Sequence, residues 1–207
     1  MTATPLTGGS PSHSGQHGAD SSNRNRGREL PMDVSEAFVA DILKPYRPNA
    51  KYLKSAQITQ FRESMEGNTK RVPLVTAKGR FSIPESCYID DTGHFNAVEF
   101  NICYNQLAYV MFGKCFDTGI VQKLKFLSLS EYKRHQLQSC YIVSLDSRFF
   151  KPLKSDAFEA ELILNKMSAM GGALFCFTAI TFSDVEGDKA QGSVVLAFNP
   201  PVSLAKH

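Results

Sequence analysis

The chain has 207 residues, of which 43% are hydrophobic, enough for one domain with a full core. Its formal net charge of +3 is too small to indicate a nucleic-acid partner, and no apolar run reaches the ~18 residues of a membrane-spanning helix. The five cysteines include no CxxC pair, and their odd number argues against a disulfide framework and for the reducing cytoplasm.

The first segment, residues 1–31, consists mainly of small and polar residues with almost no large apolar side chain. Such a composition cannot offset the entropy of the chain, so we predict a disordered tail, followed by one folded domain over 32–207. Within the domain, the apolar residues of 34–43 recur with a helical period, and Pro45 ends that predicted helix.

Two strands are predicted next, over 52–58 and 74–83, followed by a long helix over 95–113. The helix is apolar around most of its circumference, which predicts a buried position. Trp is absent and Phe occurs 15 times, so we expect a core or pocket lined by Phe and aliphatic side chains.

β-rich runs separated by turn signals make up the rest of the chain, with a short helical turn at 128–132. These runs are 121–127, 136–150, 157–166, 173–184 and 191–198. One buried helix followed by four or five antiparallel strands indicates an α+β fold with the sheet wrapped around the helix. That is the hot-dog architecture, although the periodicity fits a generic α+β meander equally well.

Polar residues are most concentrated in the segment 86–109, where the long helix begins. Asn96 is a good N-cap residue, and Glu99 stands three residues later, which is the spacing of a capping box. A helix N-terminus offers unpaired N–H groups and a partial positive charge. These groups are what a thioester carbonyl needs when negative charge develops on its oxygen.

The same region carries a resemblance to a known family. The block over 79–109, GRFSIPESCYIDDTGHFNAVEFNICYNQLAY, resembles the signature of the FcoT family, and 130–139 and 146–153 match two further blocks in the same order. The resemblance covers roughly 34–200 and implies a hot-dog fold. The family was first described as long-chain acyl-CoA thioesterases. Some members instead add glycine to the β-carbon of a (2E)-enoyl thioester on an acyl carrier protein, in routes to isonitrile lipids and β-amino-acid starter units.

The resemblance also implies where the thioester binds. Hot-dog enzymes hold it between two subunits, with the carbonyl at the N-terminus of the central helix; here that segment includes Gly93, Phe95, Asn96 and Ala97. Backbone N–H groups there would stabilise an enolate oxygen in a conjugate addition or a tetrahedral oxyanion in hydrolysis. One such donor is typically worth about 3 kcal/mol, and it serves either reaction.

Three residues stand where the family's thioesterase interpretation assigns catalysis, namely Tyr46, Tyr88 and Asn105. An Asn cannot act as a base, so Asn105 would orient a water, an amine or a carbonyl by hydrogen bonds, and Gln106 is predicted to bind substrate beside it. The alternative is structural: a satisfied buried amide for Asn105, and hydroxyls on backbone carbonyls for the two tyrosines.

Two residues are candidates for proton transfer. An imidazole titrates near neutral pH, so His94 could accept a proton from an incoming ammonium, or it could donate to the Asp90–Asp91 turn instead. Glu99 could be a general base or simply complete the capping box. No other Asp or Glu follows on the helix through Gly113, so hydrolysis lacks an obvious base apart from Glu99.

A cation beside the site is predicted from Arg148 and Lys151, which point to opposite faces of a regular strand unless a bulge intervenes. The one facing inward would anchor the carboxylate of a free amino acid, for which Arg is suited bidentately. Alternatively, these cations lie in water or contact the phosphate of a phosphopantetheine arm. Metal ligation is not expected, because the histidines have no second ligand at a characteristic spacing.

We therefore predict conjugate addition of glycine to a (2E)-enoyl thioester on an acyl carrier protein, giving an N-carboxymethyl-3-aminoacyl thioester without a metal or redox cofactor. The alternative is an acyl-CoA or acyl-carrier-protein thioesterase. A non-catalytic acyl-binding module is a third possibility, which the polar residues of 88–106 disfavour. We expect a homo-oligomer, either a dimer or a trimer of dimers, with no nucleic-acid or membrane partner.

Overall fold

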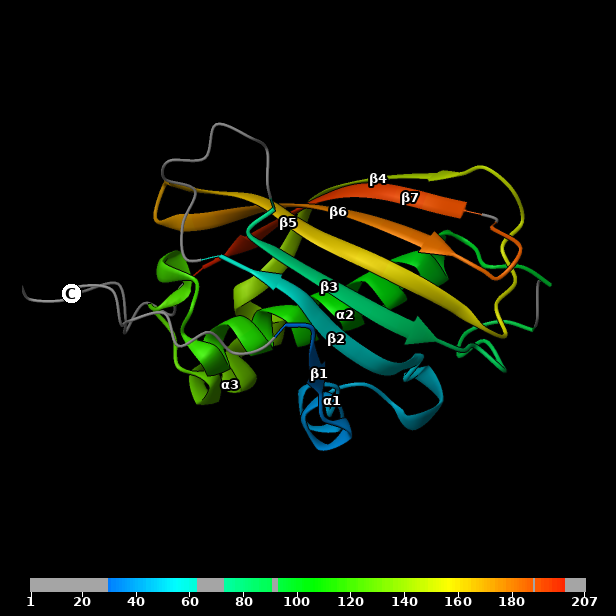
Figure 1. Ribbon diagram of the computed structural model, residues 1–207, viewed down its shortest axis with the longest axis horizontal. Coiled ribbons are helices and arrows are strands. Elements are labelled where there is room, and N and C mark those ends of the chain that lie inside the picture. Colours follow the sequence, from blue (N-terminus) through cyan, green and yellow to red (C-terminus); the bar gives the residue numbers. More distant parts are fainter. Residues whose placement is uncertain (1–29, 63–72, 91–92, 188, 200–207) are drawn as a thin grey trace, which may run out of the picture.

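The computed structural model describes residues 30–62, 73–90, 93–187 and 189–199, so the predicted tail over 1–31 lies almost wholly outside the described residues. Helices and short strands come first, and four long strands end the domain (Figure 1). The elements are β1 (Met32–Val34), α1 (Glu36–Ile42), η1 (Pro48–Ala50), β2 (Leu53–Phe61), β3 (Val75–Phe81), α2 (Ala97–Thr118), η2 (Gln122–Leu124), α3 (Leu129–Ser139), β4 (Cys140–Phe149), β5 (Phe158–Met170), β6 (Ala173–Ser183) and β7 (Lys189–Phe198).

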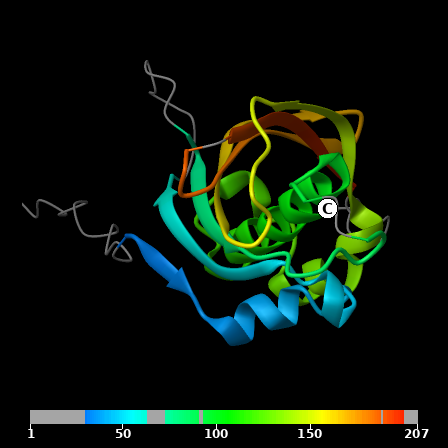
Figure 2. The same cartoon turned by 90° about the vertical axis from the view of Figure 1, so that its right-hand side faces the viewer.

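The seven strands form one antiparallel sheet in the order β1-β2-β3-β5-β6-β7-β4. Figure 2 shows that the sheet curls around α2, which lies against its concave face. The inward residues of β6, such as Leu174, Cys176 and Ile180, alternate with more exposed neighbours, as a sheet with one buried face requires. The predicted α+β hot-dog architecture is confirmed.

The central helix α2 is longer at its C-terminal end than the sequence predicts. The prediction ends at Gly113, but the helix continues to Thr118 and ends where Gly119 adopts a left-handed conformation with a φ of 62°. Gly113 is tolerated inside the helix because it allows a close approach of α1. A Cβ at this position would lie 2.9 Å from Ile42 Cδ1.

A phenylalanine cluster fills the core between the start of α2 and the sheet. The Phe95 ring lies tilted at 5.0 Å from Phe182 and 4.9 Å from Phe158, and Phe100 lies 5.8 Å from Phe149, measured between ring centroids. Such aromatic pairs add ~1 kcal/mol each beyond the area that they bury. The prediction of a Phe-rich core is confirmed, and the cluster fixes the position at which α2 begins.

The segment after α2 differs from the prediction. Residues 121–127 are not a strand: Val121, Leu124 and Leu127 are buried at a spacing of three, which a 3₁₀ turn satisfies, and η2 forms there. The helical turn predicted at 128–132 extends to Ser139 as α3. A Ser128 capping box starts that helix, so the strand predicted from residue 136 begins only at Cys140.

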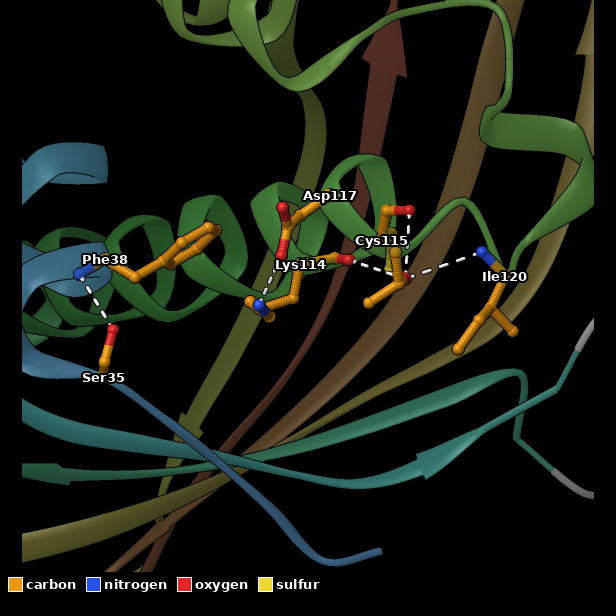
Figure 3. A network of polar contacts seen from close by, with 7 residues as sticks. Ser35, Phe38, Lys114, Cys115, Asp117 and Ile120 are labelled. Carbon is orange, nitrogen blue, oxygen red and sulfur yellow. Dashed lines mark hydrogen bonds and ion pairs between the residues drawn. The ribbon is translucent and has the colours of Figure 1, made fainter. Parts of the chain in front are cut away.

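The first helix is fixed against the C-terminal half of α2. Ser35 caps α1 by accepting a hydrogen bond from the Phe38 N–H at 3.3 Å (Figure 3). The Lys114 ammonium lies 4.5 Å from the centre of the Phe38 ring and also pairs with Asp117. These contacts hold α1 beside the C-terminal half of α2.

Gly192 in β7 permits the closest approach between the sheet and the phenylalanine cluster. A Cβ added there would lie 2.6 Å from both the Asp146 carbonyl oxygen and Phe100 Cζ. We therefore expect Gly192→Ala to lower the free energy of unfolding by about 1–3 kcal/mol. Urea denaturation measures the change, and Ser193→Ala, on the exposed side of the same strand, is the matched control. If the two variants were equally stable, β7 could move away from Asp146 and Phe100 without lowering the free energy of unfolding.

Candidate active site

The first turn of α2 is closed by a complete capping box. Asn96 Oδ1 accepts hydrogen bonds from the N–H groups of Val98 at 2.9 Å and Glu99 at 3.3 Å, and Glu99 Oε2 accepts from the Asn96 N–H at 3.2 Å. Glu99 is only 3% exposed. Its carboxylate therefore takes the structural alternative that its spacing allows, and its burial separates it from the cavity described below.

The helix N-terminus is consequently less open than the sequence predicts. The Phe95 N–H donates to the Leu153 carbonyl at 2.9 Å, and the amides of Asn96, Val98 and Glu99 serve the capping box. Within the described residues, the Ala97 N–H is the amide of this turn without a protein acceptor. In the first turn of α2, the Ala97 N–H is thus the candidate donor for the predicted anion site over Gly93–Ala97, and it carries the partial positive charge of the helix end.

A cavity of about 450 Å³ opens at this helix end. The exposed side chains of His94 and Lys151 lie at its wall, together with Ala97. Its apolar walls come from the chain that leaves β4, where Phe149 is 40% and Phe150 61% exposed. The complete lining is His94, Phe95, Asn96, Ala97, Phe149, Phe150, Lys151 and Pro152.

Tyr88 is held at the same helix end. Its hydroxyl donates to Asn96 Oδ1 at 2.8 Å, and its ring remains 45% exposed. The Asn96 oxygen therefore accepts three hydrogen bonds, two from the helix and one from Tyr88. This bond fixes the tyrosine beside the capping residue, where the resemblance expects a functional hydroxyl.

The two predicted anchor cations lie in different places. Lys151 lines the cavity with His94, whereas Arg148 lines a separate cavity of about 420 Å³ beside Thr181 and Gln191. The Arg148 Nε lies 3.6 Å from Asp146 Oδ1, with both side chains largely exposed. Of the two candidates, Lys151 thus lies at the helix N-terminus and Arg148 does not.

A second, smaller cavity of about 170 Å³ lies farther along α2. Asn105 is nine residues after Asn96, about 13 Å along the helix axis, so the two asparagines do not share one cavity. The Asn105 side chain donates to the exposed Asn101 at 3.2 Å. The cavity is lined by Asn105, Ala108, Tyr109, Cys140, Tyr141, Ile142 and Leu196.

Tyr46 belongs to this second cavity's surroundings, with its ring 6.4 Å from that of Tyr109. Burial raises the pKa of Tyr46 well above its ordinary value, and burial also raises the pKa of Tyr109 to about 12. Both phenols stay protonated at neutral pH. They can donate hydrogen bonds but cannot act as bases.

Gln106 has a structural role in place of the predicted substrate contact. The side chain is fully buried, and its Oε1 accepts from the N–H groups of Tyr52 at 3.0 Å and Leu53 at 2.9 Å. Its Nε2 donates to the Ala50 carbonyl. The amide therefore holds the start of β2 against α2 and cannot also contact a substrate.

The remaining side chains offer little for other kinds of chemistry. Burial raises the pKa of Cys140 to about 12, so this thiol is not a nucleophile at neutral pH. Across the described ranges, no three His, Cys, Asp or Glu side chains gather as metal ligands. None of the helices in these ranges combines the length and apolar composition that a membrane span requires.

Sequence reasoning missed several residues that shape the two cavities, including Tyr109, Tyr141, Phe149 and Phe150. In the sequence they are ordinary apolar or aromatic positions of a helix and a strand. The exposure of Tyr141, Phe149 and Phe150 follows from the position of β4 at the edge of the sheet, which no local pattern reveals. The only local signal is the bulky Phe pair before Pro152.

A curled sheet around a buried helix, with a cavity at the helix N-terminus, defines a hot-dog protein suited to binding a thioester. Residues 41–198 match the FcoT-like thioesterase domain family, and the chain belongs to this family. The family expected from the signature block is therefore confirmed.

Two named relatives and one solved structure illustrate the similarity. A (2E)-enoyl-ACP glycyltransferase of Streptomyces coeruleorubidus is 34% identical over 80% of this chain and 97% of its own length. An enzyme of the same name from Mycobacterium marinum is 34% identical over 95% of this chain and 97% of its own. A sigma28-regulated virulence protein of Campylobacter jejuni aligns with a TM-score of 0.45 and 13% identity, over 79% of this chain and 97% of its own.

Proposed function

We propose that this protein is a (2E)-enoyl-acyl-carrier-protein glycyltransferase, which adds the amine of glycine to the β-carbon of the enoyl thioester. The observation that carries the proposal is the cavity that brings together the His94 imidazole, the Lys151 ammonium and the Ala97 N–H. These are a proton acceptor, a carboxylate partner and an oxyanion donor. The relatives named for this reaction support the same assignment.

The three groups supply the steps of a conjugate addition. The Lys151 ammonium meets the glycine carboxylate, which would otherwise be costly to bury. His94 accepts a proton from the glycine ammonium, and the free amine then attacks C3 of the enoyl chain. The thioester oxygen becomes an enolate oxygen, which accepts from the Ala97 N–H. A proton returned to C2 completes the new C–N and C–H bonds without release of the acyl group.

The same cavity is less suited to hydrolysis of the thioester. On α2 the carboxylates are Glu99, which is buried in the helix cap, and Asp117, which pairs with Lys114 at the far end. Neither is positioned to activate a water at the helix N-terminus.

Mass spectrometry of a (2E)-enoyl carrier protein incubated with the enzyme tests the reaction. With isotopically labelled glycine, we expect a labelled adduct that remains attached to the carrier. Without glycine, the enoyl carrier protein should stay intact. Release of free acid that does not depend on glycine would contradict the proposal and favour a thioesterase.

The proposed assembly is a homodimer joined through β4. This strand lies at one edge of the sheet, and it exposes 46% of Tyr141, 50% of Val143 and 38% of Leu145. An exposed apolar edge strand pairs with other chains unless it is covered. A second copy would continue the sheet and bury these side chains in one symmetric contact.

This pairing would also unite the two cavities. In an antiparallel, two-fold symmetric pair, the Phe149 end of β4 in one subunit meets the Cys140 end in the other. The larger cavity, with His94 and Lys151, would then lie beside the partner subunit's smaller cavity, with Asn105. We therefore infer one composite site per helix N-terminus, in which Asn105 and the nearby Tyr46 orient the substrate from the second subunit.

The assembly predicts the effect of a charge on the edge strand. Val143→Glu should give a monomer, because pairing would bury two unpaired carboxylates near the two-fold axis. Light scattering measures the mass, circular dichroism checks the fold, and activity should fall with the dimer. Val185→Glu is the matched control, since Val185 is 93% exposed on the turn between β6 and β7. A Val143→Glu dimer with full activity would contradict the interface.

We also propose that the protein works in the cytoplasm, as its composition led us to expect. All five cysteines are free thiols, and four of them are buried. Free thiols are typical of proteins that work in the reducing cytoplasm. The acyl group would arrive there on the phosphopantetheine of its carrier, so the enzyme needs no bound cofactor of its own.

A further inference from the structure

A groove of about 430 Å³ separates the end of α1 from α3, away from the helix N-terminus. The ion pair from Lys133 Nζ to Asp41 Oδ2, at 2.6 Å, crosses it, and Gln136 Nε2 donates to the Ile42 carbonyl at 3.0 Å. Both contacts tie α3 to α1, which is itself fixed against α2 (Figure 3). The groove is lined by Asp41, Lys44, Pro45, Lys133, Arg134 and Gln136.

The lining of the groove carries more positive than negative charge. The chain over 44–54 carries four cations and no acidic residue, and Lys133 and Arg134 add two more from α3. The only carboxylate in the groove, Asp41, is already paired with Lys133. The whole chain has a net charge of only +3. This local excess of positive charge therefore makes the groove a better binding site for an acidic partner than the rest of the surface.

The groove also holds a buried polar atom that lacks a partner. Gln136 is 2% exposed, and its Oε1 has no hydrogen-bond partner among the described residues. An unsatisfied buried acceptor costs about 1–3 kcal/mol. A ligand with N–H groups would relieve that cost, and a pantetheine arm contains two amides.

Neighbouring residues connect the groove to the smaller cavity. Pro45 lines the groove, and the next residue, Tyr46, contacts Tyr109 at a ring distance of 6.4 Å. Tyr109 lines the smaller cavity with Asn105, and its carbonyl accepts from the Tyr132 hydroxyl of α3 at 3.1 Å. An arm anchored at the groove would thus pass Tyr46 to reach the composite site.

We infer that this basic groove is the docking surface for the acidic acyl carrier protein. Lys44 and Arg134 contact the acidic face of the carrier, and the arm with its acyl chain extends past Tyr46 toward Asn105. The inference rests on the proposed function, since it concerns the carrier that delivers the enoyl thioester. It assigns the carrier to a side of the protein that is distinct from the glycine anchor at Lys151.

The double variant Lys44→Glu/Arg134→Glu tests the inference by steady-state kinetics. With the enoyl carrier protein as substrate, kcat/KM should fall at least about tenfold, and its decrease with added salt should become weaker. With a short enoyl pantetheine thioester, kcat/KM should stay within about twofold of the wild type. The matched control, Lys78→Glu/Lys166→Glu, makes the same change of charge on exposed strand positions and should behave as the wild type.

Comparing the kinetics with different substrates distinguishes the ways in which the inference could be wrong. Unchanged kinetics of the groove variant with the carrier would overturn the inference. Equal loss with the pantetheine thioester would also overturn it, because the residues would then support the fold or the chemistry. Equal loss with an enoyl-CoA thioester would identify a phosphate site in place of a protein-docking site. If the wild type forms no glycine adduct with any substrate, the proposed function itself fails.

Discussion

Lys151→Ala should raise the apparent KM for glycine by about 10- to 100-fold, because the hydrogen bonds of a carboxylate with a charged donor are worth about 1.5–3 kcal/mol. The KM for the enoyl carrier protein should change much less, since the acyl chain and its carrier contact other surfaces. Lys151 lines the cavity at the helix N-terminus together with His94. Steady-state kinetics with each substrate varied in turn measures the two constants separately.

Arg148→Ala provides the matched control. Arg148 is also a cation near the end of β4, but it lines a different cavity and lies 3.6 Å from Asp146. Its removal should leave the glycine kinetics within about twofold of the wild type, as expected for an exposed ion pair. Lys151→Arg should retain part of the affinity, because it keeps the charge. If Arg148→Ala impairs glycine binding and Lys151→Ala does not, the anchor assignment is wrong.

The long helix and its cap were predictable because their signals are local. Asn96 and Glu99 have the capping-box spacing, and the apolar circumference of the helix indicated its burial. The segment over 121–139 was not predicted correctly. Its apolar residues fit a strand as well as a 3₁₀ turn and a helix, and the Ser128 cap resolves the choice only when Glu131 is paired with it. Short apolar runs carry this ambiguity in general.

The sequence indicated some of the residues at the cavity but not how the other candidates are arranged. The signature block identified His94, Asn96 and Ala97, which do lie at one cavity. The separation of Asn105 from them follows from helix geometry, and the role proposed for Asn105 depends on the proposed second subunit. The buried role of Gln106 depends on β2, which is more than fifty residues distant in the sequence. Contacts of that range leave no local signal.

The composite site predicts that two inactive variants restore each other. His94→Ala and Asn105→Ala should each lower turnover by roughly 10²-fold, the first by loss of the base and the second by loss of substrate orientation. Equal amounts of the two variants, after subunit exchange, give a mixture in which half of the dimers are mixed. Each mixed dimer has one site with both residues intact. Turnover should therefore recover to about a quarter of the wild-type value.

The recovery of turnover depends on whether the two residues of one site come from the same subunit or from different subunits. If His94 and Asn105 acted within one subunit, every site of a mixed dimer would lack one of them, and subunit exchange would restore nothing. The control is a mixture of two variants whose residues both lie in the same subunit's part of the composite site. A mixture of His94→Ala and Lys151→Ala subunits should remain inactive at a low concentration of glycine. No site of a mixed dimer then contains an intact copy of both residues, because the two residues belong to the same side of the site. Recovery in the first mixture but not in the second is the outcome that the edge-strand dimer requires.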